Sequence, residues 1–135
     1  MNKLLLSSFI FTLLSIGSCA PEGQAQAPFQ NLNSTDFQTM MGNDDVVVLD
    51  VRTPGEAARG IIDNAVLIDI SKPDFMQKVS QLDKSKTYLV YCRSGNRSVT
   101  ACNAMSNQGF KKLYNLQRGI LDWQRNQLPL SKYSN

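Results

Sequence analysis

The chain of 135 residues contains no histidine and only three cysteines, Cys19, Cys92 and Cys102. Histidine is the usual base beside a catalytic cysteine and the commonest metal ligand, so its absence excludes a Cys–His dyad and imidazole-ligated metal sites. A reactive thiol in this chain must therefore be activated by arginines and backbone dipoles. We expect neither a metal nor a cofactor.

The chain also lacks a strong charge of one sign, with 14 Lys and Arg against 11 Asp and Glu and a net charge of +3. The basic residues are scattered along the chain, which argues against a nucleic-acid surface. A hydrophobic content of 42% is typical of one globular domain with a sizeable core. We expect a monomer that binds small anionic molecules and no nucleic acid.

The most informative residue that is present is Cys92, which follows the apolar segment 88–91 and precedes a loop that contains Arg93 and Arg97. The residues after this loop are expected to form a helix. The first N–H groups of a helix lack partners within the helix and, together with the helix dipole, favour negative charge. A buried cysteine is often only a small hydrophobe. The polar neighbours of Cys92 predict a reactive thiolate instead.

Four motifs, in the right order, resemble the rhodanese family of sulfurtransferases. The loop reads CRSGNRS at residues 92–98, and LDVRTPGE precedes it at 49–56. The sequence GIIDNAVLI at 60–68 resembles the family's GHIPGAxNI stretch. The sequence YNLQRGILDW at 114–123, followed by Leu-Pro, resembles the closing YNLxGGIxxW…GLP segment.

The resemblance implies a two-step transfer of a sulfane sulfur through a persulfide on Cys92. The thiolate attacks the outer sulfur of a donor such as thiosulfate, and a cyanide or thiol acceptor then removes that sulfur. The N–H groups of the loop would hold the charge of the terminal sulfur. The expected substrate-binding residues are Arg93, Ser94, Gly95, Asn96, Arg97 and Arg52, with structural support from Asp50 and Glu56.

Separate roles are expected within the loop. Arg93 is the best candidate to meet the sulfonate of the donor, because of its charge and its planar fork. Gly95 lets the backbone turn and Arg97 braces the loop. Some thiosulfate-specific relatives carry a further cation at the position of Ser94, which weakens the case for thiosulfate as the physiological donor.

The role of Arg52 stays open between two alternatives. It could pair with Asp50, or with Glu56 at i, i+4, and a structural ion pair is as reasonable as a substrate contact. Arg59 is expected to be a solvated turn residue, and Trp123 a core residue.

The remaining cysteine, Cys102, shares a helical stripe with Ser98, Ala101 and Met105. Ten residues of helix, at ~1.5 Å per residue, would separate it from Cys92 by about 15 Å, beyond the ~7 Å between Cα atoms that a disulfide allows. We interpret Cys102 as a core residue rather than a resolving thiol.

The chain departs from the family pattern at five positions. Ile61 replaces the usual histidine, Asp63 and Asn64 replace Pro-Gly, Arg118 replaces the first glycine of the GG pair, and Gln127 replaces the glycine before Leu-Pro. Asn64 tolerates a left-handed backbone, whereas Arg118 would be strained if a positive φ were required there.

Strands and helices are expected to alternate, which predicts an α/β three-layer rhodanese-like fold with a five-stranded, mainly parallel sheet and helices on both faces. The expected strands are 29–32, 46–50, 66–70, 87–91 and 112–116. The expected helices start at 34 or 35 and end at 41, and cover 73–82, 96–108 and 120–126, with a helical turn at 56–59 and Gly109 at C′. In such a sheet, ligands bind at the carboxyl ends of the strands, where Asp50 and Cys92 are placed.

A separate segment precedes this domain. Met1-Asn2-Lys3 and the apolar run 4–16 are typical of an export signal and too short for a comfortable membrane span. Ile16-Gly17-Ser18-Cys19 resembles a bacterial lipobox, which predicts lipid attachment to Cys19 and an exported protein anchored on the periplasmic face of a membrane. The alternative is a cleaved signal and a soluble periplasmic protein.

The domain boundaries follow from these motifs. The lipoprotein-type signal is expected at 1–18, a flexible tether at 19–28, the rhodanese domain at 29–131 and a C-terminal tail at 132–135.

Two other functions stay open besides a sulfurtransferase. A persulfide carrier or sensor without rapid turnover would need a protein partner. Phosphatases and arsenate reductases on the related fold use Cys-x₅-Arg, whereas Arg97 follows Cys92 after only four residues.

Overall fold

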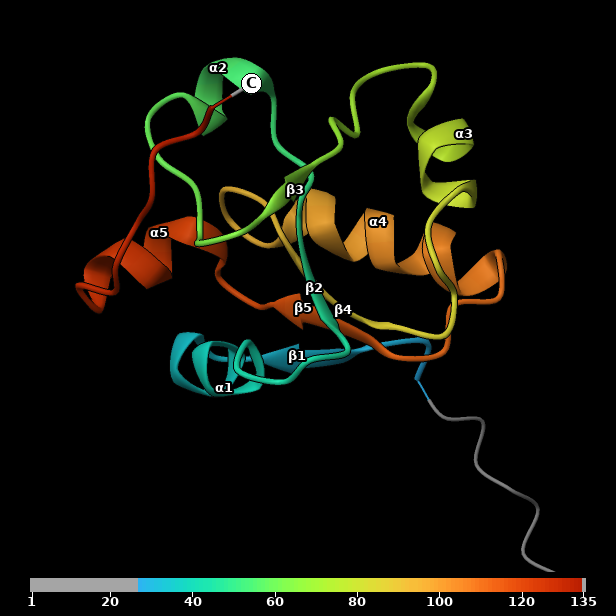
Figure 1. The fold of residues 1–135 in the computed structure, drawn as a ribbon, viewed down its shortest axis with the longest axis horizontal. Coiled ribbons are helices and arrows are strands. Elements are labelled where there is room, and N and C mark those ends of the chain that lie inside the picture. The colour runs from blue at the N-terminus through green and yellow to red at the C-terminus, as the bar shows by residue number, and fades with distance from the viewer. Residues whose placement is uncertain (1–26, 135) are drawn as a thin grey trace, which may run out of the picture.

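A computed structural model describes residues 27–134 of the chain, which form one α/β domain (Figure 1). Its five strands lie in the order β1-β5-β4-β2-β3, and all pairings between them are parallel. The predicted α/β fold class is therefore confirmed. The strands are β1 (Gln30–Leu32), β2 (Val46–Asp50), β3 (Val66–Leu67), β4 (Thr87–Tyr91) and β5 (Leu113–Leu116).

Helices cover both faces of the sheet, so the domain has three layers (Figure 1). One core cluster contains residues of α3 and α4, and the other contains residues of α1 and α5. The helices are α1 (Ser34–Met40), α2 (Pro54–Ala57), α3 (Phe75–Ser80), α4 (Asn96–Asn107) and α5 (Gly119–Arg125).

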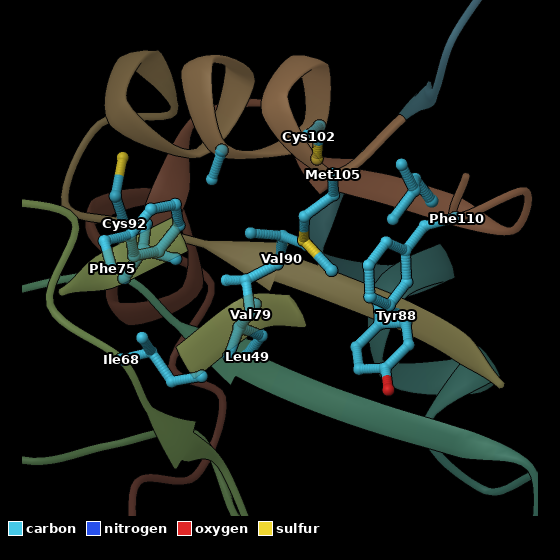
Figure 2. Packing of buried hydrophobic residues seen from close by; sticks show 13 residues of the cluster. Leu49, Ile68, Phe75, Val79, Tyr88, Val90, Cys92, Cys102, Met105 and Phe110 are labelled. Atoms are coloured by element: carbon cyan, nitrogen blue, oxygen red, sulfur yellow. The ribbon is translucent and has the colours of Figure 1, made fainter. Parts of the chain in front are cut away.

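The central strand β4 is buried on both faces, as the continuous apolar sequence of a parallel strand requires. Side chains alternate between the faces, so Tyr88 and Val90 enter the cluster with α4 while Leu89 and Tyr91 enter the cluster with α1. Cys92 continues this alternation and belongs to the α4 side, where Figure 2 shows it among the buried side chains.

Most predicted bounds lie within one residue of the structure, but two elements are shorter than predicted. The strand expected at 66–70 ends at Leu67, because its partner β2 ends at Asp50 and the ladder stops there. The helix expected at 73–82 comprises only α3, because the N–H of Phe75 closes a turn onto the carbonyl of Lys72 before the helix starts. The helical turn expected at 56–59 is also wrong, since α2 lies two residues earlier, where Thr53 caps the helix and Pro54 starts it.

The N-terminus of α1 also differs from the expectation of a Ser34 or Thr35 cap. Asn33 is the N-cap, and its side chain accepts a hydrogen bond from the N–H of Asp36. Ser34 is buried and donates its hydroxyl to Asp122 on α5. The serine thus ties two helices of one layer together instead of capping one of them.

The departures from the family pattern fit the backbone. Asn64 and Gln127 adopt the left-handed region with φ of 57° and 55°. Arg118 has a φ of −113°, and the neighbouring Gly119 takes the positive φ of 62°, so the arginine is not strained. Gly109 has a φ of 95° just after α4, as expected for its C′ position.

Between residues 27 and 134, no helix is both long enough and apolar enough to cross a bilayer. The predicted signal segment, the lipobox and Cys19 lie outside the described residues.

Candidate functional site

The topology brings the two predicted site segments together. Strands β2 and β4 are neighbours, and Asp50 pairs in register with Tyr91. The segments that follow them, with Arg52 and Cys92, therefore leave the same edge of the sheet. This is the carboxyl edge, where parallel α/β sheets bind ligands.

The thiol of Cys92 lies under the loop that leads into α4. Its Sγ atom accepts a hydrogen bond from the N–H of Gly95 at 3.1 Å and one from the hydroxyl of Ser98 at 3.4 Å. Ser98 also contacts the carbonyl of Gly95 at 3.1 Å, which holds its side chain in the loop. Cys92 is fully buried at this position.

These donors oppose the effect of burial on the thiol. Burial by itself raises the pKa of Cys92, because a thiolate loses its hydration. The hydroxyl and N–H of Ser98, together with the N–H groups of Gly95 and Ser94, stabilise the thiolate, and the pKa ends below its ordinary value. The loop therefore favours the nucleophilic form of the thiol.

The loop is held tightly against the turn between β5 and α5. Gly95 has a φ of 100°, and a Cβ atom there would lie 2.1 Å from the carbonyl oxygen of Gln117. A Cβ atom at Gly119 would lie 2.3 Å from the carbonyl oxygen of Arg93. In addition, the N–H of Ile120 donates to the carbonyl of Cys92 at 3.0 Å. Only glycine fits at these two contacts.

Arg52 lies in a buried hydrogen-bond network and pairs with Asp50, one of its two expected partners. Its guanidinium donates to both carboxylate oxygens of Asp50 at 2.6–3.0 Å and to the carbonyl of Gly60 at 2.8 Å. Tyr91 donates its hydroxyl to Asp50 at 2.7 Å, and its ring lies under the guanidinium. Burial opposes the charge of Arg52, but Asp50 outweighs it and the pKa of Arg52 is raised.

Glu56 instead pairs with Arg97, across 41 residues of sequence. Two hydrogen bonds of 2.9 and 2.7 Å join the guanidinium of Arg97 to the carboxylate. The same carboxylate closes a capping box with Thr53 at the start of α2. Arg97 lowers the pKa of Glu56 to about 2, although burial opposes this shift. The ion pair joins α2 to the first turn of α4, next to the loop.

A cavity of about 220 Å³ lies beside the loop. Its charged lining residues are Arg52, Glu56, Arg59 and Arg93. Arg59 is exposed, as expected of a turn residue, but it faces this cavity together with Arg93. The rest of the lining, which the sequence did not single out, is Gly60, Ile120, Leu121 and Gln124. Of these residues, Gly60 starts the motif at 60–68 and Ile120 and Leu121 lie in the closing motif at 114–123, whereas no motif segment includes Gln124.

The other loop residues have simpler positions. Ser94 is exposed, and Asn96, also exposed, is the first residue of α4. In residues 27–134, no group of three or more His, Cys, Asp or Glu side chains is placed to hold a metal ion.

Cys102 occupies a different environment from Cys92. It is fully buried inside α4, in the same core cluster as Phe75 and Met105 (Figure 2). Burial and the nearby charge of Cys92 raise the pKa of Cys102 to about 12. This agrees with a core residue that does not ionise near neutral pH.

A parallel α/β domain in which loop donors surround a cysteine thiol just before a helix narrows the class of protein to α/β domains with an activated thiol. Comparison with known proteins identifies the family within that class. Residues 33–126 match the model of the rhodanese-like domain, and the chain belongs to this family.

Relatives in the family differ in their named activities. The chain is 36% identical over 93 residues to a sulfurtransferase from Allochromatium vinosum, covering 69% of this chain and 85% of that protein. It is also 39% identical over 97 residues to a tRNA uridine(34) hydroxylase from Cytophaga hutchinsonii, covering 70% of this chain but only 31% of that protein.

Solved structures agree with the fold. A rhodanese-related protein from Thermoplasma volcanium superposes with a TM-score of 0.67 at 31% sequence identity. The superposition covers 76% of this chain and 97% of that one.

Proposed function

We propose that this protein is a sulfurtransferase that carries a sulfane sulfur as a persulfide on Cys92. The observation that carries this proposal is the set of donors around Sγ, which lowers the pKa of a fully buried thiol. The sulfurtransferase among the relatives, which this chain covers over most of its length, supports the same activity.

In the first step, the Cys92 thiolate attacks the outer sulfur of a donor such as thiosulfate. A bond forms between Sγ and that sulfur, the sulfur–sulfur bond of the donor breaks, and sulfite leaves with the bonding electron pair. The persulfide then carries one negative charge on its terminal sulfur. The N–H groups of residues 93–97 are the donors proposed to stabilise that charge.

In the second step, a thiolate or cyanide attacks the terminal sulfur of the persulfide. The new bond to the acceptor forms while the bond to Sγ breaks, and the electron pair returns to Sγ as the thiolate. With cyanide, the product is thiocyanate. Each step is a nucleophilic substitution at sulfur, in which one bond forms as another breaks. Neither step therefore requires an added oxidant, reductant or metal.

The arginines of the site are proposed to have two different roles, substrate binding and structural support. Arg93, the residue after Cys92, lines the cavity, which supports its proposed role of binding the anionic end of the donor. Arg97 and Arg52 are each committed to a carboxylate, Glu56 and Asp50 respectively. We therefore assign these two pairs to holding the loop and the end of β2 in place.

The direct test is to incubate the purified protein with thiosulfate and to measure its intact mass by mass spectrometry. The proposal expects a mass gain of one sulfur atom on wild type, its removal by cyanide with release of thiocyanate, and no gain on Cys92→Ser. Repeated turnover distinguishes an enzyme from a persulfide carrier, which would give one equivalent of product without its protein partner. An unmodified mass with thiosulfate and with other persulfide donors would contradict the proposal.

The same assay with an aryl phosphate tests the phosphatase alternative. A phosphoryl group presents three peripheral oxygens, and the six residues from Cys92 to Arg97 form a smaller ring than the related phosphatases use. We expect no phosphate release. Turnover of the phosphate without sulfur transfer would favour the phosphatase function over the sulfurtransferase function.

We also propose that the protein is exported and anchored through a lipid on Cys19. The support is the signal-like segment and the lipobox-like sequence that precedes Cys19. In a bacterial host, wild type should fractionate with membranes and carry a thioether lipid, whereas Cys19→Ala should not. A soluble mature form that begins after Cys19 would contradict this placement.

A further inference from the structure

The cavity beside the loop has an excess of positive charge. Two of its four charged lining residues are neutralised, since Arg52 is paired with Asp50 and Glu56 with Arg97. Among the ion pairs of residues 27–134, none involves Arg59 or Arg93. The cavity therefore presents two uncommitted guanidinium groups to whatever enters it.

These two cations come from different segments. Arg93 follows Cys92 directly, whereas Arg59 lies after α2, in the turn before the left-handed Gly60. In the proposed function, Arg93 binds a sulfonate that is one bond away from the reacting sulfur. A second anionic group held by Arg59 must instead be joined to the reacting sulfur by a short carbon chain.

The remaining lining suits such a chain. Ile120 and Leu121 add apolar surface to the cavity, and Leu121 is one of the few exposed large hydrophobic residues of the domain. The volume of about 220 Å³ is several times the roughly 30 Å³ that a water molecule takes in the liquid. It lies below the roughly 300–1,000 Å³ of pockets for drug-sized ligands, so the ligand must be small.

We propose that Arg59 is a specificity-determining residue that selects, as sulfur acceptors, small thiols that carry a carboxylate on a short carbon chain. The acceptor thiolate attacks the terminal sulfur of the Cys92 persulfide, its carboxylate pairs with Arg59, and its methylene groups contact Ile120 and Leu121. The products are the acceptor persulfide and the Cys92 thiolate. This inference rests on the proposed function and deepens it.

The kinetic test compares 3-mercaptopropionate with the neutral thiol 2-mercaptoethanol, using cyanide as the reference acceptor. Arg59→Gln should raise KM for 3-mercaptopropionate about fivefold, the size of one partly exposed ion pair. It should leave the reactions with 2-mercaptoethanol and cyanide within about twofold, and Arg59→Lys should restore part of the affinity. Lys111→Gln removes the same charge at the amino end of β5 and serves as the control.

A binding test does not depend on sulfur transfer. Propionate has the carboxylate and carbon chain without the thiol, so it should slow the alkylation of Cys92 by iodoacetamide in wild type and Lys111→Gln, and much less in Arg59→Gln. High salt should reduce this protection. If propionate protects Cys92 from alkylation but no persulfide forms with any donor, the proposed function is wrong while the carboxylate-binding site is supported.

The opposite results overturn this inference alone. Sulfur transfer to cyanide that proceeds normally, with equal KM changes for the charged and the neutral thiol in Arg59→Gln, would show that Arg59 does not select the acceptor. Equal protection by propionate in wild type and Arg59→Gln would show the same for binding.

Discussion

The pKa values of the two buried cysteines of the domain are shifted in opposite directions. Both Cys92 and Cys102 are fully buried, and both belong to the core cluster that packs against α4 (Figure 2). The pKa of Cys92 is lowered, whereas that of Cys102 is raised to about 12. Burial raises the pKa in both places, so burial does not explain the difference.

What separates them is the backbone around each sulfur. Cys92 precedes the helix, where N–H groups have no helical partner and can donate to Sγ. Cys102 lies within α4, where the helix uses its own N–H groups for its hydrogen bonds. The same core cluster therefore holds a thiol with a lowered pKa just before α4 and a thiol with a raised pKa in the middle of that helix.

The sharpest way to break this comparison is to remove each thiol in turn. Cys92→Ser should abolish sulfur transfer, because its hydroxyl does not ionise near neutral pH. Cys102→Ser should retain transfer and lose roughly 1–3 kcal/mol of stability, because it buries a hydroxyl in an apolar site. Thiocyanate formation and thermal unfolding measure the two effects. Substantial transfer by Cys92→Ser would show that another residue is the nucleophile.

The next largest effect is expected at the glycines that flank α4. Gly95 and Gly109 both have positive φ, but a Cβ atom meets the carbonyl of Gln117 at position 95 and nothing within 4 Å at position 109. Gly109→Ala should cost about 1–2 kcal/mol through backbone strain alone. Gly95→Ala should cost about 3 kcal/mol or more and lower transfer at least about tenfold.

Chemical denaturation and the transfer assay check this pair of glycine variants. Similar losses of stability and activity in both variants would show that the contact between the loop and the turn before α5 does not maintain the site.

A smaller effect should appear in the pH dependence of alkylation. Because the pKa of Cys92 is lowered, its alkylation by iodoacetamide should reach half its maximal rate below the pH typical of a free thiol. Ser98→Ala removes a donor to the thiolate and should move that midpoint to higher pH. Cys102 should stay unmodified in the native protein across this range. Mass spectrometry of the two cysteine peptides distinguishes these outcomes.

The smallest effect concerns the acid stability supplied by Glu56. The pKa of this carboxyl is lowered from 4.5 to about 2 in the folded protein, so its contribution is fully present above about pH 4.5 and is lost as the pH falls through about 2. Glu56→Gln should lower the free energy of unfolding at neutral pH by about 1 kcal/mol, since the pair with Arg97 is partly open to solvent.

The difference between wild type and Glu56→Gln should shrink in acid, which urea unfolding at several pH values measures. Asp74→Asn removes an exposed pair with Lys78 on α3 and serves as the control. A difference that stays constant down to the lowest pH would contradict the assigned role of the Glu56 carboxylate.

Much of the fold was predictable from local patterns in the sequence. The apolar β-branched run at Val46–Asp50 and the segment Thr87–Tyr91 are strands, and they place Arg52 and Cys92 at one edge of the sheet. The alternation of side chains along a strand and the turn at Gly95 are properties of short segments, so they can be predicted from the local sequence. The boundaries at Leu67 and Phe75 were missed because they depend on where a neighbouring strand or turn ends.

The pairing of charges was decided only by the tertiary structure. From the sequence, Glu56 was a possible i, i+4 partner of Arg52, but the fold brings it to Arg97 and leaves Arg52 with Asp50. Arg59 looked like a solvated turn residue until the fold placed it on the wall of the cavity. The sequence by itself determined that Cys92 precedes a helix N-terminus. Which cations are neutralised and which stay free near it depends on contacts between distant segments, because ion pairs form by proximity in space rather than along the chain.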